Sequence, residues 1–236
     1  MGEIANVIKA IFVKDLLTEL RARQLLPVQI CLGILIAWIF RVAAGASADM
    51  SVTAGAVLFV AILFSGILAS DKSFAVEQEN DCISALLLAP VDAGDIYIAK
   101  LLVNTVILCI FEIVAVPAAL VLFDVSIGGR RLEMITILLL GNIGISGVGT
   151  LLGCLVHRVK AAGSLLSILV MAVLMPMMIP AVGALTAVFG PASGQAAGAG
   201  MFGAAGDFGS AVGYMAAFDA IFVTVCWLLF GLVAGE

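Results

Sequence analysis

Charged residues are scarce in this sequence. Only 11% of its 236 residues are Asp, Glu, Lys or Arg, whereas 64% are hydrophobic. A water-soluble domain of this length is about a quarter charged and about half apolar, so the composition excludes that class of protein. The few charges cluster between long apolar runs, which is the pattern of an integral membrane protein. We therefore expect a single membrane domain over residues 1–236.

Motifs for catalysis and for cofactor binding are also missing. The sequence has no GxxxxGK[ST] loop for phosphates, no GxSxG turn and no HExxH pair. Its single histidine, His157, belongs to no cysteine–histidine cluster, and its five cysteines form no CxxC pair. We expect a chain that is not an enzyme and that holds neither a metal nor a cofactor of its own.

Six apolar runs are long enough to cross a bilayer, which takes about 20 residues in a helix. A helix satisfies its own backbone hydrogen bonds in lipid, and these runs are too long and continuous for the strands of a barrel. The sequence thus predicts an all-α integral membrane protein, with a fifth span broken by Pro176 and Pro180. The predicted spans are residues 28–48, 52–70, 101–123, 134–156, 161–189 and 211–235.

Residues 4–25 precede the first span and have a different pattern. Apolar residues such as Ile4, Ile8 and Ile11 recur at spacings of three and four, with basic residues between them. This pattern predicts an amphipathic helix that lies in the membrane interface, and Pro27 is expected to mark the turn into the first span.

The distribution of lysine and arginine between the loops predicts the orientation, because cytoplasmic loops are enriched in both residues. If the N-terminus is inside, the outer side carries three of them and the inner side eight, which places both termini in the cytoplasm. The outer residues are Arg41, Arg130 and Arg131, and the inner ones are Lys9, Lys14, Arg21, Arg23, Lys72, Lys100, Arg158 and Lys160.

The loop of residues 71–100 connects the second and third spans. Phe74 to Leu88 is predicted to form a short helix with an apolar edge, which Pro90 ends. Asp92 then stands where an N-cap would start the next helix. A short helix held between two spans could act as a lever on which another protein pushes. It could equally be an ordinary solvated loop, and the loop alone does not separate the two.

Two acidic residues fall inside the spans, Glu112 in the third and Asp219 in the sixth. An isolated ionised group there costs at least a few kcal/mol, so each should face protein or water, or be protonated. They are interpreted either as a proton or cation path or as structural hydrogen-bonding groups. The structural reading is favoured, because no basic residue stands at a matching depth.

Glycine is concentrated in the fourth span, which reads GNIGISGVGTLLG. Small residues let another helix approach closely in lipid, either within the chain or at a subunit interface. The helix-packing glycines predicted here are Gly141, Gly144, Gly147 and Gly149.

Taken together, four stretches of the sequence resemble the haem exporter protein B family (CcmB) of the cytochrome c maturation system. The resemblance covers nearly the whole chain, and these stretches carry it: FVKDLLTELRAR, ILASDKSFAVEQENDCISALLLAPVDAGDIYIAKLL, GVGTLLGCLVHRVKAAGSLLSILVMAVLMPMMIPA and MAAFDAIFVTVCWLLFGLV. The loop departs from the pattern of related permeases, which have an acid–base–acid run where this chain has Glu77, Gln78 and Glu79.

The resemblance implies a permease subunit of an ABC-type complex in the bacterial inner membrane. It implies as partners a separate ATPase subunit that binds ATP, haem-handling membrane subunits, a periplasmic haem chaperone and a second copy of the permease, with no nucleic acid. ATP turnover would then be coupled to haem delivery or to release of the haem-loaded chaperone. The residues expected to contact the ATPase are Glu77, Glu79, Asp81, Leu86, Leu87 and Leu88.

Other functions remain open at this point. An ABC permease that exports a lipid, a drug or a polysaccharide would share the same topology and the same lever. A secondary transporter coupled to ions through Glu112 and Asp219 would need no ATPase.

Overall fold

The computed structural model describes residues 2–22, 24–45, 49–79, 93–127, 129–158, 164–189 and 208–235. Within these ranges the chain is helical and contains no strand, and six helices are long and apolar enough to cross a membrane. The predicted all-α membrane fold with six spans is confirmed. The helices are α1 (Gly2–Ala22), α2 (Leu25–Ala44), α3 (Met50–Glu79), α5 (Ala93–Phe123), α6 (Arg131–Arg158), α7 (Ser164–Phe189) and α8 (Phe208–Gly235).

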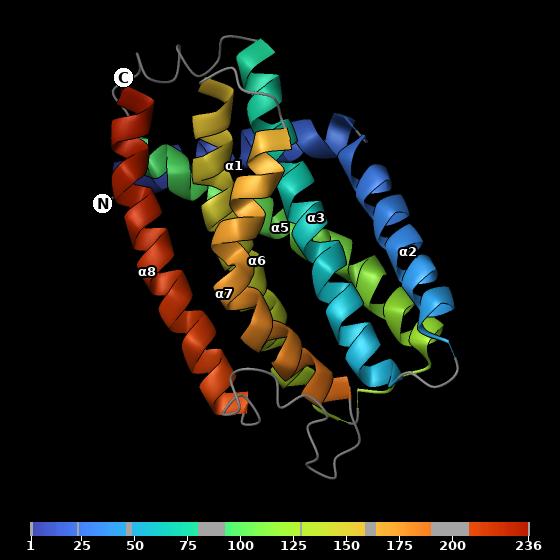
Figure 1. The fold of residues 1–236 in the computed structure, drawn as a ribbon. Coiled ribbons are helices and arrows are strands. Elements are labelled where there is room, and N and C mark those ends of the chain that lie inside the picture. Colours follow the sequence, from blue (N-terminus) through green and yellow to red (C-terminus); the bar gives the residue numbers. More distant parts are fainter. Residues whose placement is uncertain are drawn as a thin grey trace.

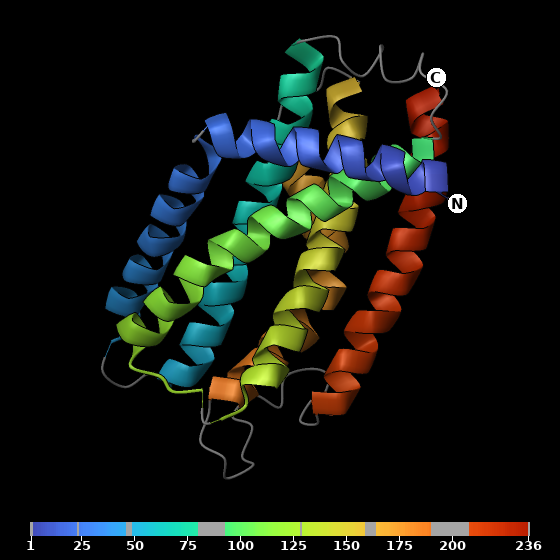
Figure 2. The same ribbon diagram turned by 180° about the vertical axis from the view of Figure 1, so that it is seen from behind.

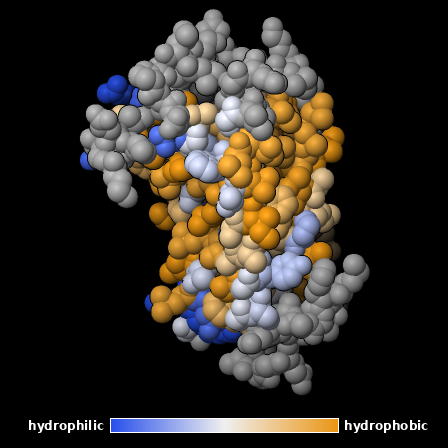
Figure 3. All heavy atoms as spheres, turned by 90° about the vertical axis from the view of Figure 1, so that its left-hand side faces the viewer, coloured by the Kyte–Doolittle hydropathy of each residue, from blue (hydrophilic) through white to orange (hydrophobic). Residues whose placement is uncertain are grey.

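The six long helices form one bundle, and α1 lies crosswise at one end of it (Figures 1 and 2). We call the end that carries α1 the α1 face; α3, α6 and α8 end there, and α5 and α7 begin there. The opposite end, called the far face, holds the end of α2 and the start of α6 and of α8. Between the two faces the surface is largely apolar, as Figure 3 shows for the side that carries α8. Such a surface suits lipid.

The helix α1 buries the apolar side that its periodicity predicts. Ile11 is buried, Phe12 and Leu16 pack on a second buried cluster that includes Ala69 and Val103, and Lys9 and Lys14 are exposed. Two details of the prediction are wrong. The helix ends at Ala22 rather than at residue 25, and Pro27 lies inside the first turn of α2 instead of in a turn before it. In a first turn the missing N–H of proline leaves no hydrogen bond unmade, so proline is tolerated there.

One other boundary and one expected break also differ from the prediction. The first span ends at Ala44 rather than at residue 48, and Gly45 follows with a φ of +67°, a conformation that favours glycine. The expected break in the fifth span is absent, because α7 runs unbroken through Pro176 and Pro180. In a membrane helix, neighbouring groups can form hydrogen bonds with the backbone carbonyl groups that a proline leaves unbonded.

The second span continues beyond its apolar stretch. A separate short helix was expected to begin at Phe74, but α3 runs unbroken through Phe74 to Glu79. No glycine or proline interrupts this part of the chain, so the helix that leaves the membrane has no local reason to stop. Residues 80–92, which include the rest of the expected short helix and Asp92, lie outside the described residues.

The helix α6 lies at the centre of the bundle and packs on α3, α5, α7 and α8. Its glycines allow this, because a Cβ atom at each would meet a side chain of a neighbouring helix. Gly141 faces Phe59 of α3, Gly147 faces Val223 of α8, and Gly149 faces Ser70 of α3. The glycine-rich face therefore makes contacts within the chain.

Candidate functional site

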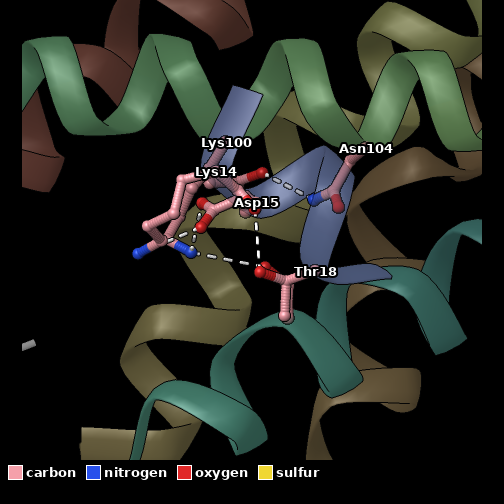
Figure 4. A network of polar contacts seen from close by, with 7 residues as sticks. Lys14, Asp15, Thr18, Lys100 and Asn104 are labelled. Atoms are coloured by element: carbon pink, nitrogen blue, oxygen red, sulfur yellow. Dashed lines mark hydrogen bonds and ion pairs between the residues drawn. The ribbon is translucent and has the colours of Figure 1, made fainter. Parts of the chain in front are cut away.

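A buried polar cluster at the α1 face surrounds Lys100, a residue of α5 that is 2% exposed. Its Nζ lies 3.7 Å from Oδ2 of Asp15 on α1 (Figure 4) and donates a hydrogen bond of 3.3 Å to Oγ of Ser73 on α3. The same Nζ stands 4.8 Å from the ring centroid of Phe74. A buried ammonium group needs such partners, because it has left water behind. We call this cluster of Asp15, Ser73, Phe74 and Lys100 the α1 junction.

The α1 junction joins three helices at the point where α3 leaves the bundle. Phe74 is 1% exposed and packs on Gly153 of α6, where a Cβ atom would lie 2.7 Å from its ring. One turn earlier, the fully buried Ser70 packs on Gly149. Real Cβ atoms do not approach this closely. The last described side chains of α3 are therefore held tightly by α6 on one side and by Lys100 on the other.

A second contact beside the junction links α3 to the start of α2. Lys72 of α3 donates a hydrogen bond of 3.3 Å to Oε1 of Gln24, just before α2. Burial raises the pKa of the Glu19 carboxyl group above its ordinary value of 4.5, and the positive charge of Lys72 partly opposes that rise. The charges on α1 thus face the bundle as well as the solvent.

Farther from the junction, Glu112 lies in the middle of α5 and is 8% exposed. Its side chain forms a hydrogen bond with Asn142 of α6, and Asn142 Nδ2 also donates to Sγ of Cys109 at 3.5 Å. Oε1 of Glu112 is buried with no hydrogen-bond partner among the described residues. A structural hydrogen-bonding group between helices would make a contact of this kind, and the role of Glu112 stays a prediction.

Asp219 of α8 is also 8% exposed and lies against α6 and α7. A Cβ atom at Gly144 would come within 2.5 Å of both Asp219 Oδ1 and Met177 Sδ, so glycine makes room for this carboxyl group. Both carboxyl oxygens are buried and have no hydrogen-bond partner among the described residues.

Glu112 and Asp219 do not share one site. Asn142, which bonds Glu112, and Gly144, which faces Asp219, are two residues apart on α6. Two residues correspond to about 200° around a helix, so the two acids contact α6 on different sides. This arrangement gives no paired-carboxylate site of the kind that a shared ion would need.

The profile of the CcmB protein family matches residues 6–225 of the chain. The chain belongs to the CcmB family. Membership implies the haem-export permease component of the cytochrome c maturation ABC system, which works with membrane partners. A comparison with curated proteins found no significant match.

In this CcmB chain, the residues predicted to contact an ATPase fall at the edge of the described structure. Glu77 and Glu79 lie in the last turn of α3, beyond the α1 junction, and nothing is described of their side chains. The remaining predicted residues are Asp81, Leu86, Leu87 and Leu88, which lie outside the described residues.

The α1 junction was not predicted from the sequence. Lys100 was counted among the charges of the inner loops and no contact was predicted for Asp15, yet the two residues meet in a nearly buried pair. A signal was present in IYIAKLLVN, where Lys100 has apolar neighbours on both sides and on the adjacent turns. A lone cation in such a run indicates a buried, paired charge.

Proposed function

We propose that this CcmB-family chain is the permease subunit of an ABC-type complex, driven by an ATPase on a separate polypeptide. ATP hydrolysis by that partner would drive haem delivery, or release of a haem-loaded periplasmic chaperone, during cytochrome c maturation. The chain itself would be non-catalytic and would bind no cofactor, with ATP on the partner and haem handled as substrate by the complex. Membership of the CcmB family supports this proposal.

The observation that carries the coupling step is the continuity of α3. This helix runs from Met50 near the far face to Glu79 beyond the α1 face without a break. A helix of this kind transmits a displacement along its axis, because its backbone hydrogen bonds are all internal. A push on the segment after residue 79 would therefore move α3 as a unit.

The α1 junction would distribute that push. Ser73 and Phe74 contact Lys100 of α5, and Lys100 contacts Asp15 of α1. Movement of α3 would displace α5 and α1 with it, and through them the far face where α5 ends. The mechanism needs two packed arrangements of these helices, one of which the ATP-bound partner favours.

Co-purification tests the partner. The double variant Glu77→Lys with Glu79→Lys reverses both charges in the last turn of α3, next to the proposed contact. We expect it to lose most of the ATPase that co-purifies with the tagged chain, and to lose cytochrome c maturation in cells. Asp124→Asn, an exposed acid at the far face, is the matched control and should retain both. Unchanged ATPase recruitment in the double variant would refute the proposed contact.

The proposed location is the cytoplasmic membrane with the α1 face in the cytoplasm. The lysine and arginine count supports this orientation. Single cysteines at Thr18 on α1 and Ser126 at the far face, both exposed, would test it in a cysteine-free background. A membrane-impermeant maleimide should reach Ser126→Cys from the periplasm and Thr18→Cys only after lysis. The reverse pattern would overturn the orientation and with it the ATPase contact.

A further inference from the structure

Asp219 is a buried carboxyl group to which the described packing of α8 offers no hydrogen-bond donor. The residue is 8% exposed, and both of its carboxyl oxygens are buried with no hydrogen-bond partner among the described residues. Glu112, by contrast, is bonded to Asn142. An ionised carboxylate only accepts hydrogen bonds, and its burial without donors is costly. The surroundings of Asp219 therefore favour its neutral, protonated form.

Two residues of the neighbouring helices define the surroundings of this carboxyl group. A Cβ atom at Gly144 of α6 would lie 2.5 Å from Asp219 Oδ1 and 2.5 Å from Met177 Sδ of α7. The carboxyl oxygen and the sulfur thus lie beside the same point of α6. A thioether sulfur is a weak acceptor and has no proton to donate. It can accept a hydrogen bond from a protonated carboxyl group but offers nothing to a carboxylate.

The charged groups of the packed helices are engaged elsewhere or distant. Among the described helices, α5, α6 and α7 pack on α8, and α7 contains no titratable residue. The charged residues of α6 and His157 lie toward its two ends, about 15–20 Å along the axis from Gly144. On α5, Lys100 is paired with Asp15, and Glu112 contacts a different side of α6. The other titratable residues of α5, α6 and α8, none of which bonds Asp219, are Asp95, Tyr97, Cys109, Cys154, Tyr214 and Cys226.

We propose that Asp219 is a proton-binding site, and that α8 docks on α6 and α7 with this carboxyl group protonated. Release of the proton to water leaves a carboxylate without donors against Gly144 and Met177, which weakens the docking. The helix α8 is suited to such control, because it lies at the edge of the bundle (Figure 1) and only 22% of its apolar window is buried. The proposal does not depend on the ATPase contact.

Infrared spectroscopy tests for the proton directly. The tagged full-length chain, with the subunits that co-purify, is measured at about pH 7, where an ordinary aspartate is ionised. We expect the unaltered chain to show a carbonyl band of a protonated carboxyl group that Asp219→Asn removes. Asparagine keeps the shape of the side chain without an ionisable group. In a chain that contains aspartate labelled with a heavy carbon isotope at the carboxyl group, the same band should shift.

Thermal unfolding tests what the proton does for the fold. The folded chain keeps a proton at Asp219 that the unfolded chain releases above about pH 4, so stability falls as pH rises. We expect the melting temperature of the unaltered chain to fall by about 3–5 °C per pH unit more than that of Asp219→Asn. The comparison isolates Asp219 from other groups that titrate. Asp124→Asn, an exposed acid at the far face, is the matched control and should follow the unaltered chain.

Three results would overturn the proposal. A spectrum in which Asp219→Asn removes no protonated carboxyl band would show that the group is ionised in the folded chain. Equal pH profiles for the unaltered chain and Asp219→Asn would show the same for its effect on stability. Loss of a co-purifying subunit from a well-folded Asp219→Asn variant would assign the carboxylate to a cation of that partner. If Asp219→Asn does not fold, the isotope shift of the unaltered chain decides.

Discussion

Asp15 of α1 and Lys100 of α5 form an ion pair across two helices, with 3.7 Å between Oδ2 and Nζ and only 2% of the lysine exposed. The two residues are far apart in sequence, Asp15 on an amphipathic helix and Lys100 in an apolar stretch. Their contact ties the helix that crosses the bundle to the helix that follows the 80–92 segment. This pair is the centre of the α1 junction and gives the first prediction.

Removal of Asp15 should destabilise the protein more than removal of its exposed neighbour. Asp15→Asn leaves Lys100 buried without its carboxylate, and we expect a loss of about 3 kcal/mol in the free energy of unfolding. Lys14→Gln removes only the exposed partner of the Lys14–Asp15 pair and should cost less than about 1 kcal/mol. Thermal unfolding in detergent measures both. The double variant Asp15→Asn with Lys100→Met should regain part of the loss; no recovery would contradict the pairing.

The contact between Gly153 and Phe74 should tolerate no added methyl group. Gly153→Ala places a Cβ atom 2.7 Å from the ring, and the resulting overpacking should cost about 1–3 kcal/mol. Gly183→Ala on α7 meets nothing within 4 Å and should change stability by less than about 0.5 kcal/mol. Melting temperatures of the two variants provide the comparison. Phe74→Leu should rescue Gly153→Ala, because it removes the ring that clashes.

Glu112 should be replaceable by glutamine if its role is a hydrogen bond to Asn142. Glu112→Gln keeps a polar partner for the amide, whereas Glu112→Leu leaves Asn142 with only its contact to Cys109 Sγ, at a cost of about 1–2 kcal/mol. Cytochrome c maturation in cells and thermal stability should both survive the first change. Loss of maturation in a well-folded Glu112→Gln variant would instead indicate that the ionisable group itself is needed.

Glu19 should make stability depend on pH. Burial raises its pKa above 4.5, so the folded chain holds this proton at pH values where the unfolded chain has released it. The stability it contributes is therefore complete below its ordinary pKa and declines as pH rises through the raised one. Glu19→Gln mimics the protonated form and should flatten the melting temperature between about pH 4 and 7. If Glu19→Gln left the pH profile of the melting temperature unchanged, the Glu19 side chain would be exposed to water rather than buried.

The spans and the family could be predicted from the sequence because both depend on local features. Long apolar runs identify a membrane helix without knowledge of its neighbours, and the motifs that resemble the CcmB family are contiguous stretches such as ALLLAPV and LLSILV. The boundaries were less accurate: α3 was expected to end before Phe74, and α7 was expected to break at its prolines. The first error assumed an end where no glycine or proline interrupts the helix. The second treated two prolines as decisive although neighbouring groups can satisfy the backbone carbonyls that they leave unbonded.

The candidate site was predicted only in outline. Glu77 and Glu79 were placed next to the second span, as the structure has them, but their proposed partner contact is still a prediction. The α1 junction could not be derived, because Asp15 pairs with Lys100 only if α1 crosses the bundle at the level of Lys100 on α5. The sequence shows that a buried lysine needs a partner, and several acids were available.

By itself, the amino-acid sequence determined that this protein is embedded in a membrane, that it has six membrane helices and to which family it belongs. Hydropathy and motif identity are properties of short stretches of sequence. Tertiary structure alone decided that Lys100 meets Asp15 and that the glycines of α6 face other helices of the same chain. It alone also placed Glu112 and Asp219 on different sides of α6 and brought Arg41 of α2 to the carbonyl oxygen of Leu122 on α5. These outcomes depend on how helices rotate and cross when they pack, and packing is settled by the whole bundle rather than by any one segment.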